Sequence, residues 1–137
     1  MIVVEAKVTI NSQYAMNSKT LMSGLRTTMK IANYGYICQL FVLSGKLITL
    51  DVDNLLEIKI LYGETNIELF QENVEFEFVS GKQRIGKGYI TKVKEIYVEK
   101  DVLESLQDKK LAKEIILHAE KMKNALIYND AYEVLKE

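Results

Sequence analysis

The sequence has no proline, one cysteine, one histidine and no long apolar run, and the last three of these shortages each exclude a class of structure or chemistry. Cys38 has no second cysteine with which to form a disulfide within the chain, and its apolar surroundings predict a buried structural thiol. A metal site needs about three or four converging ligands, which one histidine and one cysteine do not supply. The longest apolar run, about residues 34–43, contains Gln39 and is too short to span a bilayer.

The same shortages limit the catalytic chemistry. His118 is the only histidine, and its position in a helical pattern is typical of a half-buried structural residue. Glu75 and Glu77 lie at i, i+2 spacing on one face of an expected strand, where two carboxylates can act as acid and base, but a solvated strand face explains them as well. No Gly-x-x-x-x-Gly-Lys-Ser/Thr loop, which cradles phosphates, is present. We expect no enzyme, no cofactor and no bound nucleotide.

The chain is long enough for one domain with a proper core, since 48% of its 137 residues are hydrophobic. Its N-terminus alternates between apolar and polar residues and lacks the apolar stretch and the cleavage site of a signal peptide. With no membrane span and no possible internal disulfide, we expect a cytoplasmic protein that does not act at a membrane.

The net charge of −1 argues against general affinity for nucleic acid, but the charges are distributed unevenly. Residues 51–78 carry one base and eight acids, for a net charge of −7, whereas residues 79–94 carry five bases and no acid. Two interpretations fit. The two segments can pair across strands of a small barrel, where each opposite-charge pair contributes about 0.2–1 kcal/mol. Alternatively, the basic segment is a binding face.

Alternating apolar positions before residue 100 predict six or more short strands, as in a barrel or a sandwich. We expect strands over residues 2–10, 25–31, 36–43, 46–52 and 55–61, with the same pattern continuing through 67–69 and 74–78 and a closing strand over 88–98. Residues 11–23 are expected to form a long loop. The predicted fold is mainly β, a small antiparallel barrel of six to eight strands over residues 1–99.

The apolar period changes after residue 100. Asp101 and Glu104 form an Asp-x-x-Glu capping box, and apolar residues then repeat at four- and three-residue steps. This pattern predicts a C-terminal α-helical extension over residues 100–137 that packs on the barrel through its apolar stripe. A partner-binding surface is the alternative use of the stripe.

The most informative segment is FEFVSGKQRIGKGYITKV, residues 76–93. Two alternating runs flank a turn at residues 80–82, which predicts a β-hairpin. Gly86 and Gly88 lie in its second strand, where glycine indicates that another backbone or a ligand comes close. The hairpin carries four basic residues, Lys82, Arg84, Lys87 and Lys92, and no acid lies between Phe78 and Glu95.

Three segments of the chain, taken in order, match the pattern of a known family. They are EAKVTI (residues 5–10), SGLRTTMKI (residues 23–31), where Gly24 and Arg26 match a Gly-Tyr-Arg-Pro sequence, and the hairpin, with matches at Phe76, Gly81, Gly86, Gly88, Thr91 and Lys92. Together they resemble the C-terminal β-barrel domain (domain III) of elongation factor Tu and related translation GTPases. The resemblance covers about residues 3–95 and implies a stand-alone, diverged copy of that barrel.

In elongation factor Tu this barrel helps to hold the T-arm of aminoacyl-tRNA, through a Gly-Gly-Arg loop after the first strand and a Gly-Gly-Arg-Thr turn in the closing hairpin. Here the first loop, AMNSKTLM (residues 15–22), has neither glycine nor arginine, and the turn reads Gly81-Lys82-Gln83-Arg84. Because a backbone that approaches phosphate closely needs glycine, the resemblance implies the fold more than the tRNA site.

We interpret the chain as a non-catalytic binding module that binds a protein partner through the basic hairpin, with tRNA or another RNA as the second kind of partner. Charge-assisted contacts would supply the affinity. The alternative is an immunity or inhibitor protein that neutralises a toxin or mimics elongation factor Tu, with the acidic stretch Glu64 to Glu77 facing the toxin. The candidate contact residues are Lys19, Arg26, Gly81, Lys82, Gln83, Arg84 and Lys87.

Overall fold

The computed structural model describes residues 1–12 and 20–97. The helical extension expected over residues 100–137, the candidate contact residue Lys19 and the single histidine, His118, lie outside the described residues.

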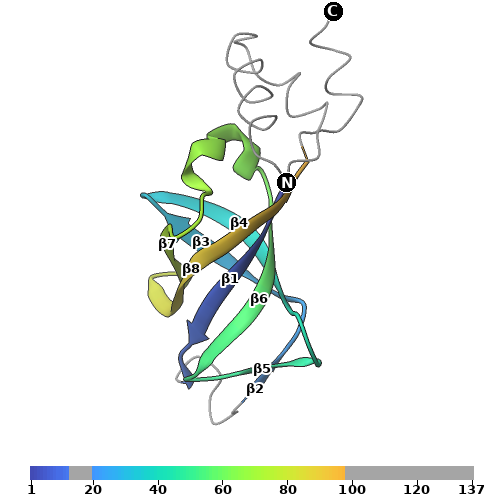
Figure 1. Ribbon diagram of the computed structural model, residues 1–137. Coiled ribbons are helices and arrows are strands. Elements are labelled where there is room, and N and C mark those ends of the chain that lie inside the picture. The colour runs from blue at the N-terminus through green and yellow to red at the C-terminus, as the bar shows by residue number, and fades with distance from the viewer. Residues whose placement is uncertain (13–19, 98–137) are drawn as a thin grey trace, which may run out of the picture.

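Six strands close into an antiparallel barrel in the order β1-β6-β4-β3-β7-β8, and two short strands form a separate ribbon, β2-β5 (Figure 1). This confirms the mainly β fold and the barrel, with a strand number inside the expected range. The elements are β1 (Ile2–Ile10), β2 (Thr20–Met22), β3 (Leu25–Ile31), β4 (Tyr34–Val42), β5 (Leu47–Thr49), β6 (Asp53–Ile60), the 3₁₀-helix η2 (Gly63–Leu69), β7 (Glu75–Ser80) and β8 (Gln83–Ile96).

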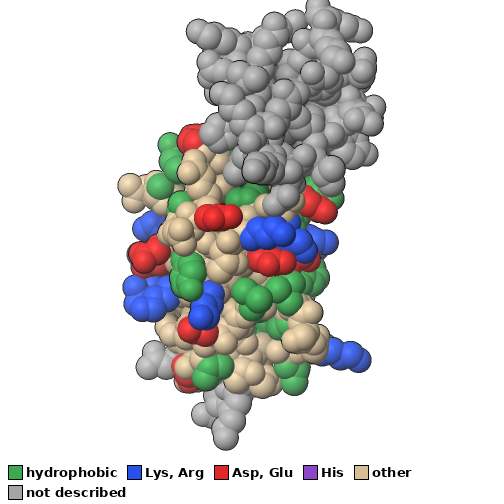
Figure 2. All heavy atoms as spheres, in the orientation of Figure 1, with side chains coloured by type: hydrophobic (Ala, Val, Ile, Leu, Met, Phe, Trp, Pro, Cys, Tyr) green, Lys and Arg blue, Asp and Glu red, His purple; other side chains and the backbone are tan. Residues whose placement is uncertain are grey.

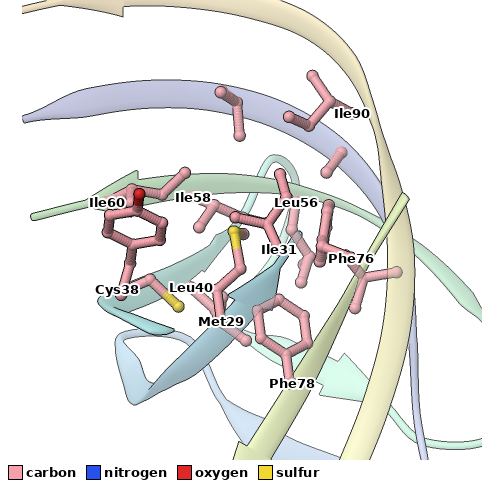
Figure 3. Packing of buried hydrophobic residues seen from close by; sticks show 14 of the residues in the cluster. Met29, Ile31, Cys38, Leu40, Leu56, Ile58, Ile60, Phe76, Phe78 and Ile90 are labelled. Carbon is pink, nitrogen blue, oxygen red and sulfur yellow. The ribbon is translucent and has the colours of Figure 1, made fainter. Parts of the chain in front are cut away.

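The core lies inside the barrel and follows from the alternation of the strands. Successive residues of a strand point to opposite faces, and in β1 the side chains of Val4, Ala6, Val8 and Ile10 are fully buried. Figure 3 shows apolar side chains from several strands pointing into the same interior. The buried cluster also contains Cys38, so the predicted burial of the thiol is confirmed.

The apolar residues between β6 and β7 were expected to continue the strand pattern, and this prediction is wrong. The segment forms η2 instead, which crosses one end of the barrel (Figure 1). Ile67 and Phe70 are buried and lie three residues apart, which is the spacing that places two side chains on the same side of a 3₁₀ turn. The ring of Phe70 packs edge-on against Tyr36, with 5.3 Å between ring centroids. The segment thus covers the end of the barrel.

The long loop expected over residues 11–23 contains a strand that the sequence pattern did not predict. β2 pairs with β5, and the pairing places Leu21 opposite the buried Ile48. β5 is also shorter than the strand expected over residues 46–52. A three-residue strand is too short to show alternation, so only its partner reveals it.

The glycines of β8 lie where β1 passes close to it, which confirms the backbone approach predicted for them. A Cβ atom on Gly86 would lie 2.7 Å from the carbonyl oxygen of Thr9, and one on Gly88 would meet the carbonyl oxygen of Lys7. Gly88 also lies opposite Phe76 in the hairpin, and its Cβ would lie 3.1 Å from the Phe76 ring. The hairpin and β1 therefore meet at a distance that only glycine permits.

Candidate functional site

One row of side chains crosses five strands on the outside of the barrel. The register places Asp53 of β6 opposite Thr9 of β1, and Thr9 opposite Lys87 of β8. On its other side Lys87 faces Glu77 of β7, and Glu77 faces Lys30 of β3. Because neighbouring strands lie about 4.8 Å apart, the row brings together charged side chains from four strands, with the uncharged Thr9 of a fifth strand between Asp53 and Lys87. Along β8, β7 and β3 the charges alternate in sign.

A cleft of about 680 Å³ lies over this row and the next one. The next row contains Lys7 of β1, Tyr89 of β8 and Glu75 of β7, each opposite its neighbour. Tyr89 is 38% exposed and lies in the middle of this second row. Arg84 and the β3–β4 turn also line the cleft, so residues from five strands and one turn form it.

Part of the charge in the cleft is already neutralised by ion pairs. Nη1 of Arg84 lies 3.0 Å from Oε1 of Glu77, across the hairpin, and both side chains are about half exposed. Nζ of Lys7 lies 3.9 Å from Oδ2 of Asp53. Exposed pairs of this kind contribute only about 0–1 kcal/mol each. The acidic and basic segments do pair across strands, as the first interpretation of the charge pattern expected.

Two lysines of the cleft keep their charge available. Lys30 and Lys87 are exposed, and neither has an ion-pair partner among residues 1–12 and 20–97. On the face formed by β8, β1 and β6, Figure 2 shows basic and acidic side chains interspersed, without a continuous basic area. The cleft therefore offers isolated positive charges next to carboxylates.

Of the candidate contact residues, Arg84 and Lys87 line the cleft. Lys82 and Gln83 are exposed at the β7–β8 turn, and Arg26 is exposed on β3, beyond the residues that pair with β7. Gly81 has a φ of +61° and no atom within 4 Å of an ideal Cβ, so the turn conformation explains this glycine without a close contact. The basic turn is thus adjacent to the cleft rather than part of it.

The sequence interpretation missed Lys7, Lys30 and Tyr89. Lys7 and Lys30 come next to the hairpin through strand register, and their spacing in the sequence carries no sign of this. Tyr89 belongs to the hairpin itself, where it lies opposite Glu75. Glu75 and Glu77, considered as an acid–base pair, do lie in one cleft, but Glu77 is held by Arg84. The acidic stretch is divided between two elements, since Glu68 lies in η2 and Glu75 and Glu77 lie in β7.

A second charged cluster lies on the same side of β1, outside the cleft. Glu5 of β1 and Glu57 of β6 are directly opposite each other, and Nζ of Lys94 lies 3.7 Å and 2.9 Å from their carboxylates. The hydrogen bond to Glu57 and the nearby charge of Glu57 raise the pKa of Lys94. Lys94 thus screens two carboxylates that would otherwise repel each other, and the cluster has a structural explanation.

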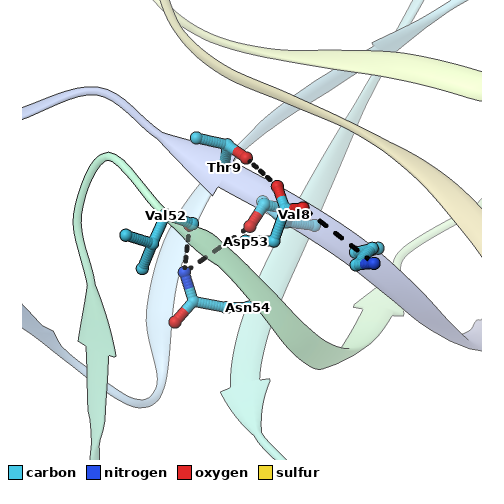
Figure 4. A network of polar contacts seen from close by, with 6 residues as sticks. Val8, Thr9, Val52, Asp53 and Asn54 are labelled. Carbon is cyan, nitrogen blue, oxygen red and sulfur yellow. Dashed lines mark hydrogen bonds and ion pairs between the residues drawn. The ribbon is translucent and has the colours of Figure 1, made fainter.

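The turn between β5 and β6 is held by hydrogen bonds from and to its own side chains. Asn54 donates to the carbonyl oxygen of Thr49 at 2.7 Å. It also donates to the carbonyl oxygen of Val52 at 3.0 Å, and Thr9 donates to Oδ1 of Asp53 at 2.6 Å (Figure 4). Asp51 has a φ of +61°, and hydrogen bonds from Ser12 lower its pKa. These bonds fix the edge of the cleft that Asp53 provides.

Other chemical groups offer no alternative site in the part of the chain that the structure describes. Burial raises the pKa of the Cys38 thiol to about 12, so the thiolate that acts as a nucleophile does not form near neutral pH. Within residues 1–12 and 20–97, no three His, Cys, Asp or Glu side chains are grouped so that they could hold a metal ion. The same residues contain no helix that is long and apolar enough to span a bilayer.

Compared with models of protein families and with curated proteins, the chain matches none of them.

Proposed function

We propose that the chain is a cytoplasmic, non-catalytic binding module resembling domain III of elongation factor Tu, and that the cleft binds a protein partner. The closed antiparallel barrel of six strands supports the resemblance at the level of the fold. The proposal includes a helical extension over residues 100–137, which lie outside the described residues. The observation that carries the binding function is the cleft itself, because it collects side chains from five strands around one exposed tyrosine.

The charges of the cleft favour a protein over RNA. An RNA-binding face neutralises several phosphates with Lys and Arg and is therefore uniformly basic. Here Asp53, Glu75 and Glu77 lie among the basic residues and would repel a polyanion. Tyrosine and arginine are enriched where proteins bind each other, and Tyr89 and Arg84 both line the cleft. A protein can place an acid near each lysine and a base near Glu75.

The test is a charge reversal at the two unpaired lysines. The double variant Lys30→Glu, Lys87→Glu should lose the partner that the wild-type chain captures from a lysate of the source cell, once that partner has been identified and its affinity measured. The matched control, Lys46→Glu with Lys92→Glu, makes the same change of charge at two exposed lysines outside the cleft and should keep the partner.

The same capture experiment distinguishes a protein partner from an RNA partner, because both protein and RNA are identified in the eluate. The proposal is supported if one protein is captured by the wild-type chain and by the control variant but not by Lys30→Glu, Lys87→Glu, the cleft variant. If the cleft variant instead loses an RNA, with an affinity that falls by about 0.7 log units per phosphate contact for each tenfold rise in salt, the partner is RNA. Equal affinity of all three chains for the same partner would place the binding face elsewhere.

A further inference from the structure

On the basis of the binding function proposed above, we infer that the partner enters the cleft as an extended segment and adds to β7 where β7 and β3 stop pairing. The segment carries acidic side chains for Lys30 and Lys87 and an apolar or aromatic side chain for Tyr89. Three observations lead to this: the short seam between the two strands, the direction of the backbone at Glu75, and the charges beside it.

The seam between β3 and β7 is the shortest in the barrel. It consists of Thr28–Val79, Met29–Phe78 and Lys30–Glu77, whereas each of the other five pairs of barrel strands has between five and nine paired positions. Beyond the last of these pairs β3 enters the β3–β4 turn, while β7 extends to Glu75 and pairs there with β8 alone. The cleft is lined by residues from both sides of this opening.

The backbone of Glu75 is directed toward the opening. The carbonyl oxygen of Val74 accepts a hydrogen bond of 3.0 Å from the N–H of Ile90, so the carbonyl of Val74 faces β8. Because successive residues of a strand direct their backbone groups to opposite sides, the N–H and C=O of Glu75 face away from β8, toward β3. In the described parts of the chain, no backbone hydrogen bond joins Glu75 to the β3–β4 turn.

Unpaired backbone groups at the edge of a strand are a template for a further strand, and a polypeptide satisfies both a donor and an acceptor. The phosphate groups of an RNA offer no donor for the carbonyl of Glu75. Lys30 lies next to the opening, and Lys87 lies across β7 from it in the same row, so acidic side chains of a segment at the opening face Lys30 directly and Lys87 over the outer face of β7. Tyr89 lies opposite Glu75 and offers a ring to an apolar side chain.

The experiment removes one backbone donor without touching the hairpin ladder. Glu75→Pro deletes the N–H that faces away from β8, and proline is tolerated in a strand where its missing donor is not part of the ladder. Glu75→Ala is the matched control, because it removes the same carboxylate and keeps the N–H. The probe is a fluorescent peptide of about ten residues in which Asp alternates with Val and Tyr, titrated by anisotropy against the full chain.

We expect the wild-type chain to bind the peptide, and Glu75→Pro to bind it about tenfold or more weakly than Glu75→Ala does, because the hydrogen bond from the Glu75 N–H is lost and its acceptor in the peptide is left unsatisfied. The same peptide with Lys in place of Asp should not bind. A second measurement does not depend on whether the proline variant folds. A peptide with N-methyl groups on alternate amides cannot add as a strand, so it should bind the wild-type chain as weakly as the unmodified peptide binds Glu75→Pro.

Undiminished binding by Glu75→Pro and of the methylated peptide overturns the addition of a strand. The proposed binding function is tested separately, by the charge-reversal variant Lys30→Glu, Lys87→Glu. Failure of the wild-type chain to bind the acidic peptide, or binding of a labelled RNA oligonucleotide in its place, also overturns the inference.

Discussion

Replacing Gly86 by alanine should destabilise the barrel, whereas the same replacement at Gly35 should stabilise it. Both glycines lie in strands and neither has a positive φ, so the two substitutions differ in the space that the new methyl group meets. At Gly86 the Cβ would lie 2.7 Å from the carbonyl oxygen of Thr9, closer than the 3.0 Å that real Cβ atoms respect. At Gly35 the nearest atom is Cγ2 of Thr28 at 3.6 Å, an ordinary contact.

The magnitude follows from two opposing terms. Overpacking costs about 1–3 kcal/mol, because the backbone of β1 must move away from β8. Replacing glycine by alanine within a strand returns about 0.5–1 kcal/mol of chain entropy. The net loss at Gly86 is therefore about 0–2.5 kcal/mol, and the net gain at Gly35 is about 0.5–1 kcal/mol. In a domain of this size each kcal/mol shifts Tm by roughly 4–8 °C.

The assay is thermal and urea unfolding followed by far-ultraviolet circular dichroism on the two variants and the wild-type chain. Gly86→Ala should lower both Tm and the urea midpoint with an unchanged slope, and Gly35→Ala should raise both. A Gly86→Ala chain as stable as the wild type would refute the close approach of β1 to β8, and so would a shift of both variants in the same direction.

Three further predictions concern single residues. Ala32 has a φ of +46° in the β3–β4 turn, where an L side chain is strained, so Ala32→Gly should stabilise the chain by about 0.5–1 kcal/mol in urea unfolding; destabilisation would contradict the strain. Lys94→Met should lower the stability of the fold at pH 7, because the carboxylates of Glu5 and Glu57 would then face each other without a cation between them. Folding raises the pKa of Lys94, so the contribution of Lys94 to stability is present below the ordinary pKa of 10.5 and is lost above it. The difference in stability between the variant and the wild type should therefore shrink as the pH rises through this range. The Cys38 thiol has its ordinary pKa of 9.0 in the unfolded chain, whereas burial raises the pKa to about 12 in the folded chain. Between these two pH values the free energy of unfolding should fall by up to about 1.4 kcal/mol per pH unit. Cys38→Ala should remove this contribution to the pH dependence of stability.

β1 and β3 are the strands that the sequence predicted best, since both begin and end where the alternation placed them. Every second residue of β1 enters the core, and in β3 Met29 and Ile31 do so. The pattern at Ile67 and Leu69 also alternates, but there the residues that reach the core are Ile67 and Phe70. A spacing of two residues and a spacing of three residues are hard to distinguish over so short a segment. The segment forms a 3₁₀-helix because it crosses the end of the barrel and buries Ile67 and Phe70 there.

The site was predicted only where it depends on neighbours in sequence. Arg84 and Lys87 belong to a hairpin whose two strands adjoin along the chain, so their place beside Glu77 could be expected. Lys30 reaches the same row through the pairing of β3 with β7, and Lys7 enters the cleft through the pairing of β1 with β8. Register between distant strands is set by closure of the whole barrel, and no local pattern reports it.

The ends of β1 and β8 meet at one end of the barrel, where the Met1 amine donates to the carbonyl of Tyr97 and the Tyr97 N–H donates to the carbonyl of Met1, both at 2.7 Å. From there the two strands run antiparallel through nine paired positions. A force that pulls residues 1 and 97 apart would break the hydrogen bonds between β1 and β8 one after another, in the unzipping geometry, so the barrel should open at low force. The same force applied between residues 10 and 97 would load the whole ladder in shear, and the barrel should then resist it far more strongly. The mechanical strength of this barrel therefore depends on where it is held.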